Sequence, residues 1–392
     1  MSQSFSAVVA GHICLDIIPE IAATGHERFL ARLQPGRLVE IGPAAFSTGG
    51  PVSNTGLALH KLGVPTRLMG KVGADRFGEI LRDIVSGYSP ELARGMIVDG
   101  ASSTSYSLIF SPPGVDRIFL HSPGANHTFC AADVDFNLVA QTNVFHFGYP
   151  PVMRRMYENG GREMAEMFAR VKAGGVLTSL DMAFPDPAFP AGKADWHAIF
   201  EAVLPSVDIF LPSIEELLFC LIRPLHDRMA GRDGKILQRI TPALLHEVSA
   251  ALIGMGVKIV VLKLGDRGLY VRTAGADAIR SLGHGIDGEA WGGRELWAPC
   301  FQVEVVGTTG AGDATIAGFL AAMLRGLPPA DAATMAVAVG ACNVEAADAL
   351  SGLRSWDVTR ARVTGGWPHH ALALTAPGWQ WDLVHQLWIG PG

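Results

Sequence analysis

The sequence predicts an α/β fold with a mainly parallel central sheet covered by helices on both faces. Apolar stretches at 144–147, 176–180, 209–211 and 259–262 have the length and composition of buried strands, and helical stretches such as 153–173 separate them. With 392 residues, 49% of them hydrophobic, the chain can form a sizeable core, so we expect one large domain with a minor appendage.

The composition narrows the class of partner. A net charge of −6 over the whole chain argues against nucleic acid or an anionic membrane and favours a small-molecule ligand. The five cysteines show no C-x-x-C spacing and are odd in number, so we expect reduced thiols. A signal peptide begins with a positively charged region, but no Lys or Arg precedes Arg28 in this sequence. The apolar runs are too short to span a bilayer. We therefore expect a cytoplasmic protein without a membrane partner.

The N-terminal stretch predicts a buried strand followed by a binding residue. Residues 7–10 are apolar, and Gly11 and then Asp16 follow them. Ligands of open α/β sheets bind beyond the carboxyl ends of the strands. An ionised Asp16 would accept hydrogen bonds from two adjacent hydroxyl groups, although an acid at this place is also a common loop cap.

Two later segments predict short strands outside the main sheet. Residues 19–48 lack helical periodicity and carry several Pro and Gly residues, so a strand at 37–41 fits better than a helix. Stretches 104–110 and 117–121 resemble two more strands, joined by a turn with Pro and Gly at 111–116. Together they predict a small sheet that stands off the main domain.

Other glycine-rich stretches predict turns or loops. Gly49-Gly50-Pro51-Val52-Ser53-Asn54 precedes a helix that ends near Gly63, and Lys263-Leu264-Gly265-Asp266-Arg267-Gly268 follows a predicted strand. Residues 281–300 are long and rich in glycine, which favours a mobile flap. The tail from Trp367 onward has four of the eight tryptophans and needs a surface to cover it, on its own domain or on a second subunit.

The stretch 303–313 carries the strongest chemical signal. Residues 303–306 alternate like a strand and residues 314–324 form a small apolar helix, so the glycines between them lie at a strand-to-helix turn. Gly310 and Gly312 permit a close approach of a ligand, and the first amides of a helix attract phosphate oxygens. Asp313 in the first turn would stay ionised and accept a hydroxyl proton.

A phosphate cradle beside a base indicates phosphoryl transfer to an alcohol, but a structural turn with an Asp cap has the same pattern. A Rossmann turn is the nearest rival. Thr315 stands where its third Gly or Ala belongs, and the stretch lies late in the chain. The sequence contains no G-x-x-x-x-G-K-[ST] motif, which excludes a P-loop enzyme.

The stretch GTTGAGD at 307–313, followed by Ala-Gly-Phe-Leu at 317–320, resembles the C-terminal signature DTTGAGD of the ribokinase-like (PfkB) carbohydrate kinases. Residues 49–54 resemble the family's N-terminal signature, and residues 70–78 match its pattern G-x-V-G-x-D-x-F-G. The resemblance runs in family order from about residue 7 to 350. It implies a three-layer α/β/α domain, placed at 1–365, with a small β-sheet lid from about 17–48 and 102–122. The Trp-rich tail then occupies 366–392.

The resemblance implies an ATP-dependent sugar kinase that uses Mg²⁺. Asp313 would be the general base, and the amides of Thr309, Gly310, Ala311 and Gly312 would form the anion hole. The other implied contacts are Asp16, Gly50 and Asn54 for the acceptor, Lys263, Gly265, Gly268 and Asn343 for the nucleotide, and Glu216 for magnesium. Two positions depart from the family: Ser213 replaces the Asn of its N-x-x-E motif, and Gly307 replaces an Asp that helps to ligate a monovalent cation in relatives.

The residues leave the acceptor open. A nucleoside would stack on aromatic lid residues, for which Phe46, Tyr106 and Phe110 are candidates. A sugar phosphate would need basic residues there, for which the candidates are Arg28, Arg32, Arg37 and Arg117. A non-catalytic ligand-binding relative and a dinucleotide enzyme are further alternatives. The tail would also be covered in a homodimer, which is a possible assembly.

Overall fold

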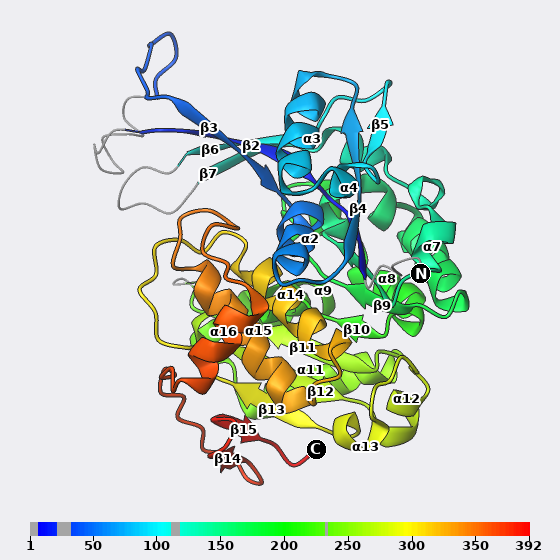
Figure 1. Ribbon diagram of the computed structural model, residues 1–392, viewed down its shortest axis with the longest axis vertical. Coiled ribbons are helices and arrows are strands. Elements are labelled where there is room, and N and C mark those ends of the chain that lie inside the picture. Colours follow the sequence, from blue (N-terminus) through cyan, green and yellow to red (C-terminus); the bar gives the residue numbers. More distant parts are fainter. Residues whose placement is uncertain (1–6, 22–32, 111–117, 232–233) are drawn as a thin grey trace.

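The computed structural model describes residues 7–21, 33–110, 118–231 and 234–392, and it contains a large sheet with a smaller sheet beside it (Figure 1). The strands of the large sheet are β1 (Ala7–Gly11), β4 (Thr66–Gly73), β5 (Ile97–Asp99), β8 (Val144–Gly148), β9 (Leu177–Leu180), β10 (Ile209–Phe210), β11 (Ile259–Lys263), β12 (Leu269–Thr273), β13 (Glu295–Ala298), β14 (Gln380–Asp382) and β15 (Leu387–Ile389). Their order is β14-β15-β13-β12-β11-β10-β9-β8-β1-β4-β5. The strands from β5 to β11 in this order pair in parallel, and those from β12 to β14 pair antiparallel. The predicted α/β fold with a mainly parallel sheet is confirmed.

Helices cover both faces of the large sheet because its strands are apolar on both sides. In β1, Ala7 and Val9 belong to one buried cluster, whereas Val8 and Ala10 belong to the other. The first cluster packs under α2 (Pro51–Lys61), α3 (Arg76–Tyr88), α4 (Pro90–Ala93), α12 (Ala276–Arg280), α13 (Gly288–Trp291), α14 (Ala311–Leu324), α15 (Pro329–Asn343) and α16 (Trp356–Thr364). The second packs under α5 (Phe136–Val139), α6 (Arg154–Tyr157), α7 (Arg162–Ala173), α8 (Trp196–Val203), α9 (Ile214–Leu221), α10 (Arg223–Ala230) and α11 (Pro242–Gly254). None of the helices in the described ranges is both long and apolar enough to cross a membrane.

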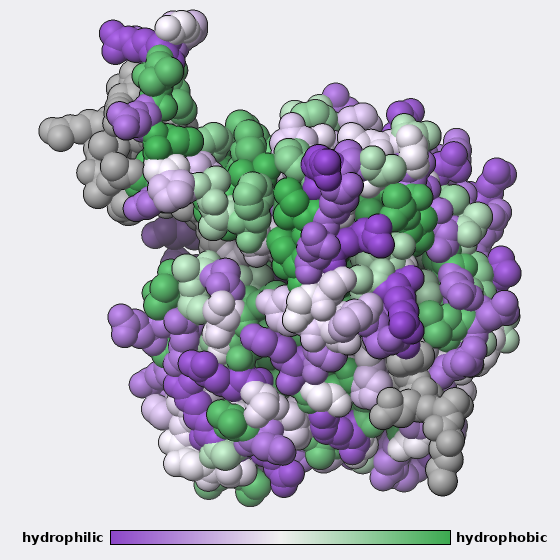
Figure 2. Space-filling model, turned by 45° about the horizontal axis from the view of Figure 1, so that its top comes forward, coloured by the Kyte–Doolittle hydropathy of each residue, from purple (hydrophilic) through white to green (hydrophobic). Residues whose placement is uncertain are grey.

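The small sheet, which we call the lid, projects from the main body (Figure 1). It has the order β3-β2-β6-β7, with β2 (Cys14–Pro19), β3 (Ala44–Gly49), β6 (Tyr106–Phe110) and β7 (Ile118–Ser122). Apolar side chains gather on this projection (Figure 2), and Phe46, Phe119 and Leu120 are each at least half exposed. The buried Asn126 ties the chain after β7 to the β1–β2 connection, because its amide bonds both the N–H and the carbonyl of Ile13.

Two predicted strands are absent from the structure. Residues 37–41 are irregular, and the lid strand in this region is β3 instead. Residues 303–306 are also irregular, and the preceding strand β13 already pairs with β12 on one side and with β15 on the other. The alternation at 303–306 has another cause, since Val303 and Val305 line a cavity while Glu304 is exposed. The predicted turn at 111–116 lies outside the described residues, as do Arg28, Arg32 and Arg117.

Two further expectations need correction. The helix expected at 153–173 is broken, because Asn159, Gly160 and Gly161 adopt positive φ angles that an α-helix cannot contain. Residues 281–300 do not form a mobile flap: they contribute α13 and the buried strand β13. The Trp-rich tail lies on its own domain, where β15 pairs with β13 and Trp367 stacks on Phe301.

Candidate active site

Parallel strands end side by side and bring polar groups together. His12 follows β1, Tyr149 follows β8, Asp181 follows β9, Glu216 lies in the first turn after β10, and Lys263 ends β11. All these strand ends are carboxyl ends of one parallel sheet, the edge at which open α/β folds bind ligands.

The N-terminus of α14 is built to approach an anion. Gly310 precedes the helix with φ 69°, and a Cβ there would lie 2.6 Å from the Cβ of Ala349, so the turn requires glycine. No side chain caps this end of the helix. The first amides of a helix have no intrahelical partners, and the helix dipole adds partial positive charge. The helix N-terminus therefore has the geometry and the partial charge that favour an anion.

Asp313 lies in this first turn and is only 2% exposed. Three side chains donate hydrogen bonds to its carboxylate. Asn54 Nδ2 is 2.9 Å from Oδ2, and Thr55 Oγ1 is 3.2 Å from Oδ1. The hydroxyl of Tyr149 lies 3.1 Å from Oδ1 and 3.0 Å from Oδ2. The carboxylate therefore has a fixed orientation.

The environment of Asp313 favours a carboxylate that can take up a proton. Burial raises the pKa of Asp313, and the hydrogen bonds of Asn54, Tyr149 and Thr55 and the charge of Lys263 only partly oppose this. Burial and the nearby carboxylate of Asp313 raise the pKa of Tyr149 well above its usual range, so its hydroxyl remains protonated and donates.

Beside the N-terminus of α14, the ammonium group of Lys263 lies near several carboxylates. Lys263 Nζ donates to Asp181 Oδ1 at 2.6 Å. Burial acts against the charged form, but Asp181, Glu216 and Asp313 outweigh it and raise the pKa of Lys263. Burial raises the pKa of Asp181, and its Oδ2 atom has no hydrogen-bond partner among the described residues. Glu216 caps α9, because its Oε2 accepts from the N–H of Ser213 at 2.7 Å.

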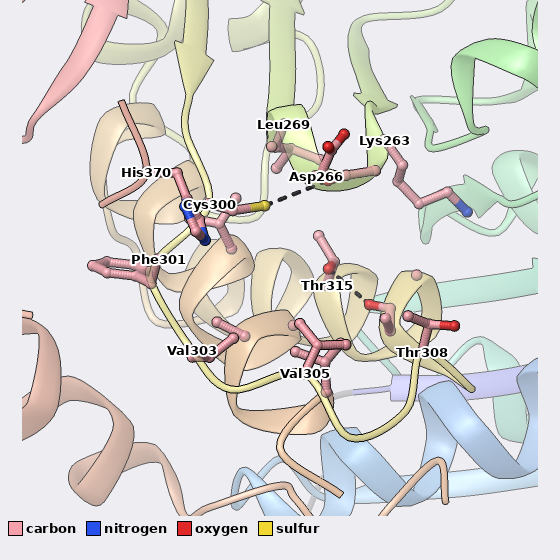
Figure 3. Close-up of a pocket in the computed structure, with 18 residues that line it drawn as sticks. Lys263, Asp266, Leu269, Cys300, Phe301, Val303, Val305, Thr308, Thr315 and His370 are labelled. Atoms are coloured by element: carbon pink, nitrogen blue, oxygen red, sulfur yellow. Dashed lines mark hydrogen bonds between the residues drawn. The ribbon is translucent and has the colours of Figure 1, made fainter. Parts of the chain in front are cut away.

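A cavity of about 390 Å³ adjoins this cluster. Figure 3 shows Lys263 at one end and Cys300, Phe301 and His370 toward the other, with Thr308 on the helix side. The predicted nucleotide residues Gly265 and Gly268 line the cavity, as do Ala311 and Gly312. Apolar side chains make up much of the remaining wall, among them Leu269, Val303, Val305, Val337, Ala341 and Val344.

Two residues predicted to contact the nucleotide, Asn343 and Thr309, do not line the cavity. Asn343 does not line the cavity or the surface of its helix: its side chain is fully buried, and Nδ2 donates to the carbonyl of Ala349 at 2.6 Å. The structure thus places Asn343 in the packing behind the turn at Gly310. Thr309 lies in the turn, half-buried, and is not among the residues lining the cavity.

The predicted acceptor residues lie where the lid joins the domain. Asp16 is a buried residue of β2, and a Cβ at Gly49 would lie 2.5 Å from its Oδ2 atom. Gly50 has φ 88° and passes so close to His12 that a Cβ would clash with its ring and its carbonyl. Asn54, also expected to contact the acceptor, donates to Asp313.

The sequence profile of the pfkB family carbohydrate kinases matches residues 8–356. The chain belongs to this family. It is therefore a sugar kinase, a phosphotransferase with an alcohol group as acceptor. Fructokinase-2 of Zea mays is 26% identical to this kinase over 312 residues, which are 79% of this chain and 77% of that protein.

The fold of the kinase resembles solved ribokinases. A structure of Arabidopsis thaliana ribokinase complexed with ribose and ATP superposes with a TM-score of 0.66 and 19% identity, covering 91% of this chain and 98% of that one. A putative ribokinase II from E. coli in complex with ATP and Mg²⁺ gives a TM-score of 0.66 at 20% identity, covering 92% and 99%. The ribokinase-like fold expected from the resemblance is confirmed.

Sequence reasoning missed three residues of the kinase that surround the predicted base. Tyr149 and Thr55 bond Asp313, and Asp181 bonds Lys263. Asp181 and Tyr149 directly follow the strands β9 and β8, so their place at the carboxyl edge was a signal available in the sequence. Thr55 carried no such signal, because only the packing of α2 against α14 brings it to Asp313.

Proposed function

We propose that this kinase transfers the γ-phosphate of ATP to a hydroxyl group of a small sugar, with Asp313 as general base. The buried carboxylate of Asp313 in an uncapped helix turn carries the proposal. The neighbouring residue Gly312 lines the cavity, and Asn54, which bonds Asp313, is four residues from Gly50 beside the lid. Asp313 thus lies where a nucleotide in the cavity and an acceptor under the lid would meet.

The two ends of the cavity differ in polarity, so they favour one orientation of a bound ATP molecule. The apolar end of the cavity, with Phe301 and Val303, would take the adenine ring, and its Lys263 end would take the phosphates. The amides of residues 309–312 would then stabilise the charge that develops on the transferred phosphoryl group. The ATP bound in the Arabidopsis thaliana and E. coli ribokinase structures supports this choice of nucleotide.

The carboxylates near Lys263 fit a magnesium ion. Mg²⁺ prefers oxygen ligands and uses one or two carboxylates together with phosphates and water. Glu216 and Asp181 would hold it, because the Oδ2 atom of Asp181 is buried without a described partner and Lys263 alone does not balance the negative charge. When bound, the ion would neutralise charge on the triphosphate. The capping bond of Ser213 meanwhile orients Glu216.

A coupled ADP-release assay with ATP, Mg²⁺ and a panel of sugars, sugar phosphates and nucleosides tests the proposal. We expect turnover with a free sugar such as fructose or ribose. Fructose is suggested by the similarity to fructokinase-2 of Zea mays, and ribose by the similarity to Arabidopsis thaliana ribokinase. A nonhydrolysable ATP analogue and the right sugar should together raise the melting temperature, because they bind only the folded state. The proposal would be contradicted if only nucleosides or sugar phosphates were phosphorylated. It would also be contradicted if none of the compounds in the panel were phosphorylated.

We expect Tyr149→Phe to change the pH dependence of the reaction. The hydroxyl of Tyr149 donates to both oxygens of Asp313 and thereby lowers the pKa of this carboxylate. Its removal should raise that pKa, so the acidic limb of the kcat–pH profile should move to higher pH. A larger fraction of Asp313 should then be protonated at each pH, so kcat should fall most on the acidic side of the profile. An unshifted profile would show that Tyr149 does not position the base.

We expect little dependence on potassium. A Cβ at Gly307 would lie 2.9 Å from the carbonyl oxygens of Ala346 and Ala347, so backbone fills the place of a side chain. Glycine offers no side-chain oxygen to a monovalent cation. Rates measured in potassium, sodium and choline chloride at one ionic strength should agree. Strong activation by potassium alone would contradict this expectation.

A further inference from the structure

Three side chains with metal-binding atoms meet at the junction of the lid and the domain. His12 lies between β1 and β2, Cys14 begins β2, and His121 belongs to the lid strand β7. Their ligand atoms, the ring nitrogens and Sγ, all lie within 4.8 Å of one another. His12 and Cys14 are buried, whereas His121 is exposed, so one of the three side chains is accessible to solvent.

The two imidazoles face each other in the geometry of a shared ion. His12 Nε2 and His121 Nε2 are 3.4 Å apart, which is long for a direct hydrogen bond. Two nitrogens bound tetrahedrally to zinc at about 2.0–2.1 Å are separated by about 3.3–3.4 Å. The observed separation of the two Nε2 atoms therefore matches that of two ligands of one zinc ion.

The surrounding structure holds these side chains in place. Ser107 Oγ lies 3.0 Å from Nδ1 of His121 and so leaves Nε2 turned to His12. The backbone of His12 is fixed on both sides, because its N–H donates to Gly148 and its carbonyl accepts from Val52. The Nδ1 atom of His12 has no hydrogen-bond partner among the described residues, so Nε2 is the ring atom through which it makes a polar contact.

We propose that His12, Cys14 and His121 form a site for a divalent transition metal such as Zn²⁺. Nitrogen and sulfur donors select such ions over Mg²⁺, so this site is separate from the carboxylates near Lys263. The thiol of Cys14, which now donates to Asp16 Oδ1 at 3.3 Å, gives its proton to solvent when the Sγ–metal bond forms. Three protein ligands leave the fourth tetrahedral position to water.

The site would fasten the lid to the domain. His12 belongs to the connection that leaves the central sheet, Cys14 begins the lid strand β2, and His121 belongs to β7 at one edge of the lid. An ion bound to all three would hold β7 against the β1–β2 connection, and it would stabilise the folded state because the unfolded chain does not preform the site.

Metal binding to the full chain, freed of metal by a chelator and without ATP or sugar, tests the proposal independently of the kinase reaction. Zn²⁺ competing with a chromophoric chelator should bind at one equivalent per chain and raise the melting temperature. Co²⁺ should show visible bands of tetrahedral coordination and a near-ultraviolet thiolate-to-cobalt band. Excess Mg²⁺ should not displace either ion.

Variants identify the ligands. His121→Gln should weaken zinc binding by at least about tenfold and remove the zinc-induced rise in melting temperature. Cys14→Ser should remove the thiolate band. The controls are His197→Gln on α8, whose side chain is exposed, and Cys130→Ser, a half-buried thiol outside the cluster; both should bind as the wild type does.

Three results would overturn the site: no stoichiometric zinc in the wild type, a cobalt spectrum without the thiolate band, or His121→Gln binding zinc as tightly as the wild type. If Cys14→Ser does not fold, the cobalt spectrum of the wild type and the affinity of His121→Gln still decide the question. A change of sugar KM in His121→Gln without any zinc binding would assign the imidazoles to the acceptor instead and also overturn the site.

Discussion

Asp313→Asn should lower kcat by about 10²–10⁴-fold, the usual contribution of general acid–base catalysis. An amide cannot take the hydroxyl proton, but it fits the site. Its oxygen can accept from Asn54, and its NH₂ group can donate to the hydroxyl of Thr55, which accepts as readily as it donates. Nucleotide affinity and melting temperature should therefore change little.

Steady-state kcat and calorimetric binding of a nonhydrolysable ATP analogue separate these effects. Asp357→Asn is a matched control, since Asp357 is an exposed acid in the first turn of α16, and it should keep wild-type kcat. More than about a tenth of wild-type turnover in Asp313→Asn would exclude Asp313 as the base. If neither protein turns over any polyol although both bind ATP, a non-catalytic binding role would gain support.

Asp16→Ala should lower kcat/KM for the sugar by about 30- to 900-fold. This corresponds to a loss of roughly 2–4 kcal/mol of transition-state stabilisation. Asp16 is buried on the lid strand β2, and the backbone of Gly49 passes close to its carboxylate. Two hydroxyl groups of a bound sugar would lose their acceptor when this carboxylate is removed, and water cannot fully replace it in a closed site.

The affinity for ATP distinguishes this role from a structural one. Asp16 does not line the cavity in which we propose that ATP binds, so the Kd of an ATP analogue should stay near the wild-type value. Asp16→Asn keeps the size of the side chain and one acceptor oxygen, so its kcat/KM should fall between those of Asp16→Ala and the wild type. Equal losses in sugar use and ATP binding would make Asp16 a structural cap.

Local pattern was sufficient for much of the fold. The apolar runs of β8, β9 and β11 predicted a parallel sheet, because strands buried on both faces need apolar residues at every position. The glycine at position 310 predicted a tight turn. The structure has a positive φ angle there, which glycine adopts without strain. The pattern failed at 303–306, where Val303 and Val305 line a cavity, because local alternation does not determine whether an extended segment meets another strand with which it can pair.

The sequence by itself determined the fold class, the family and the helix turn that carries Asp313, because these depend on short-range periodicity, glycine geometry and contiguous motifs. Only the tertiary structure decided what surrounds that carboxylate. Asn54 and Tyr149 are far from Asp313 along the chain, and they meet it because α2 packs on α14 and because β8 ends at the same sheet edge. The meeting of His12 with His121 across the lid arises in the same way. No local pattern contains such contacts, since they depend on how separate elements bury their apolar faces against one another.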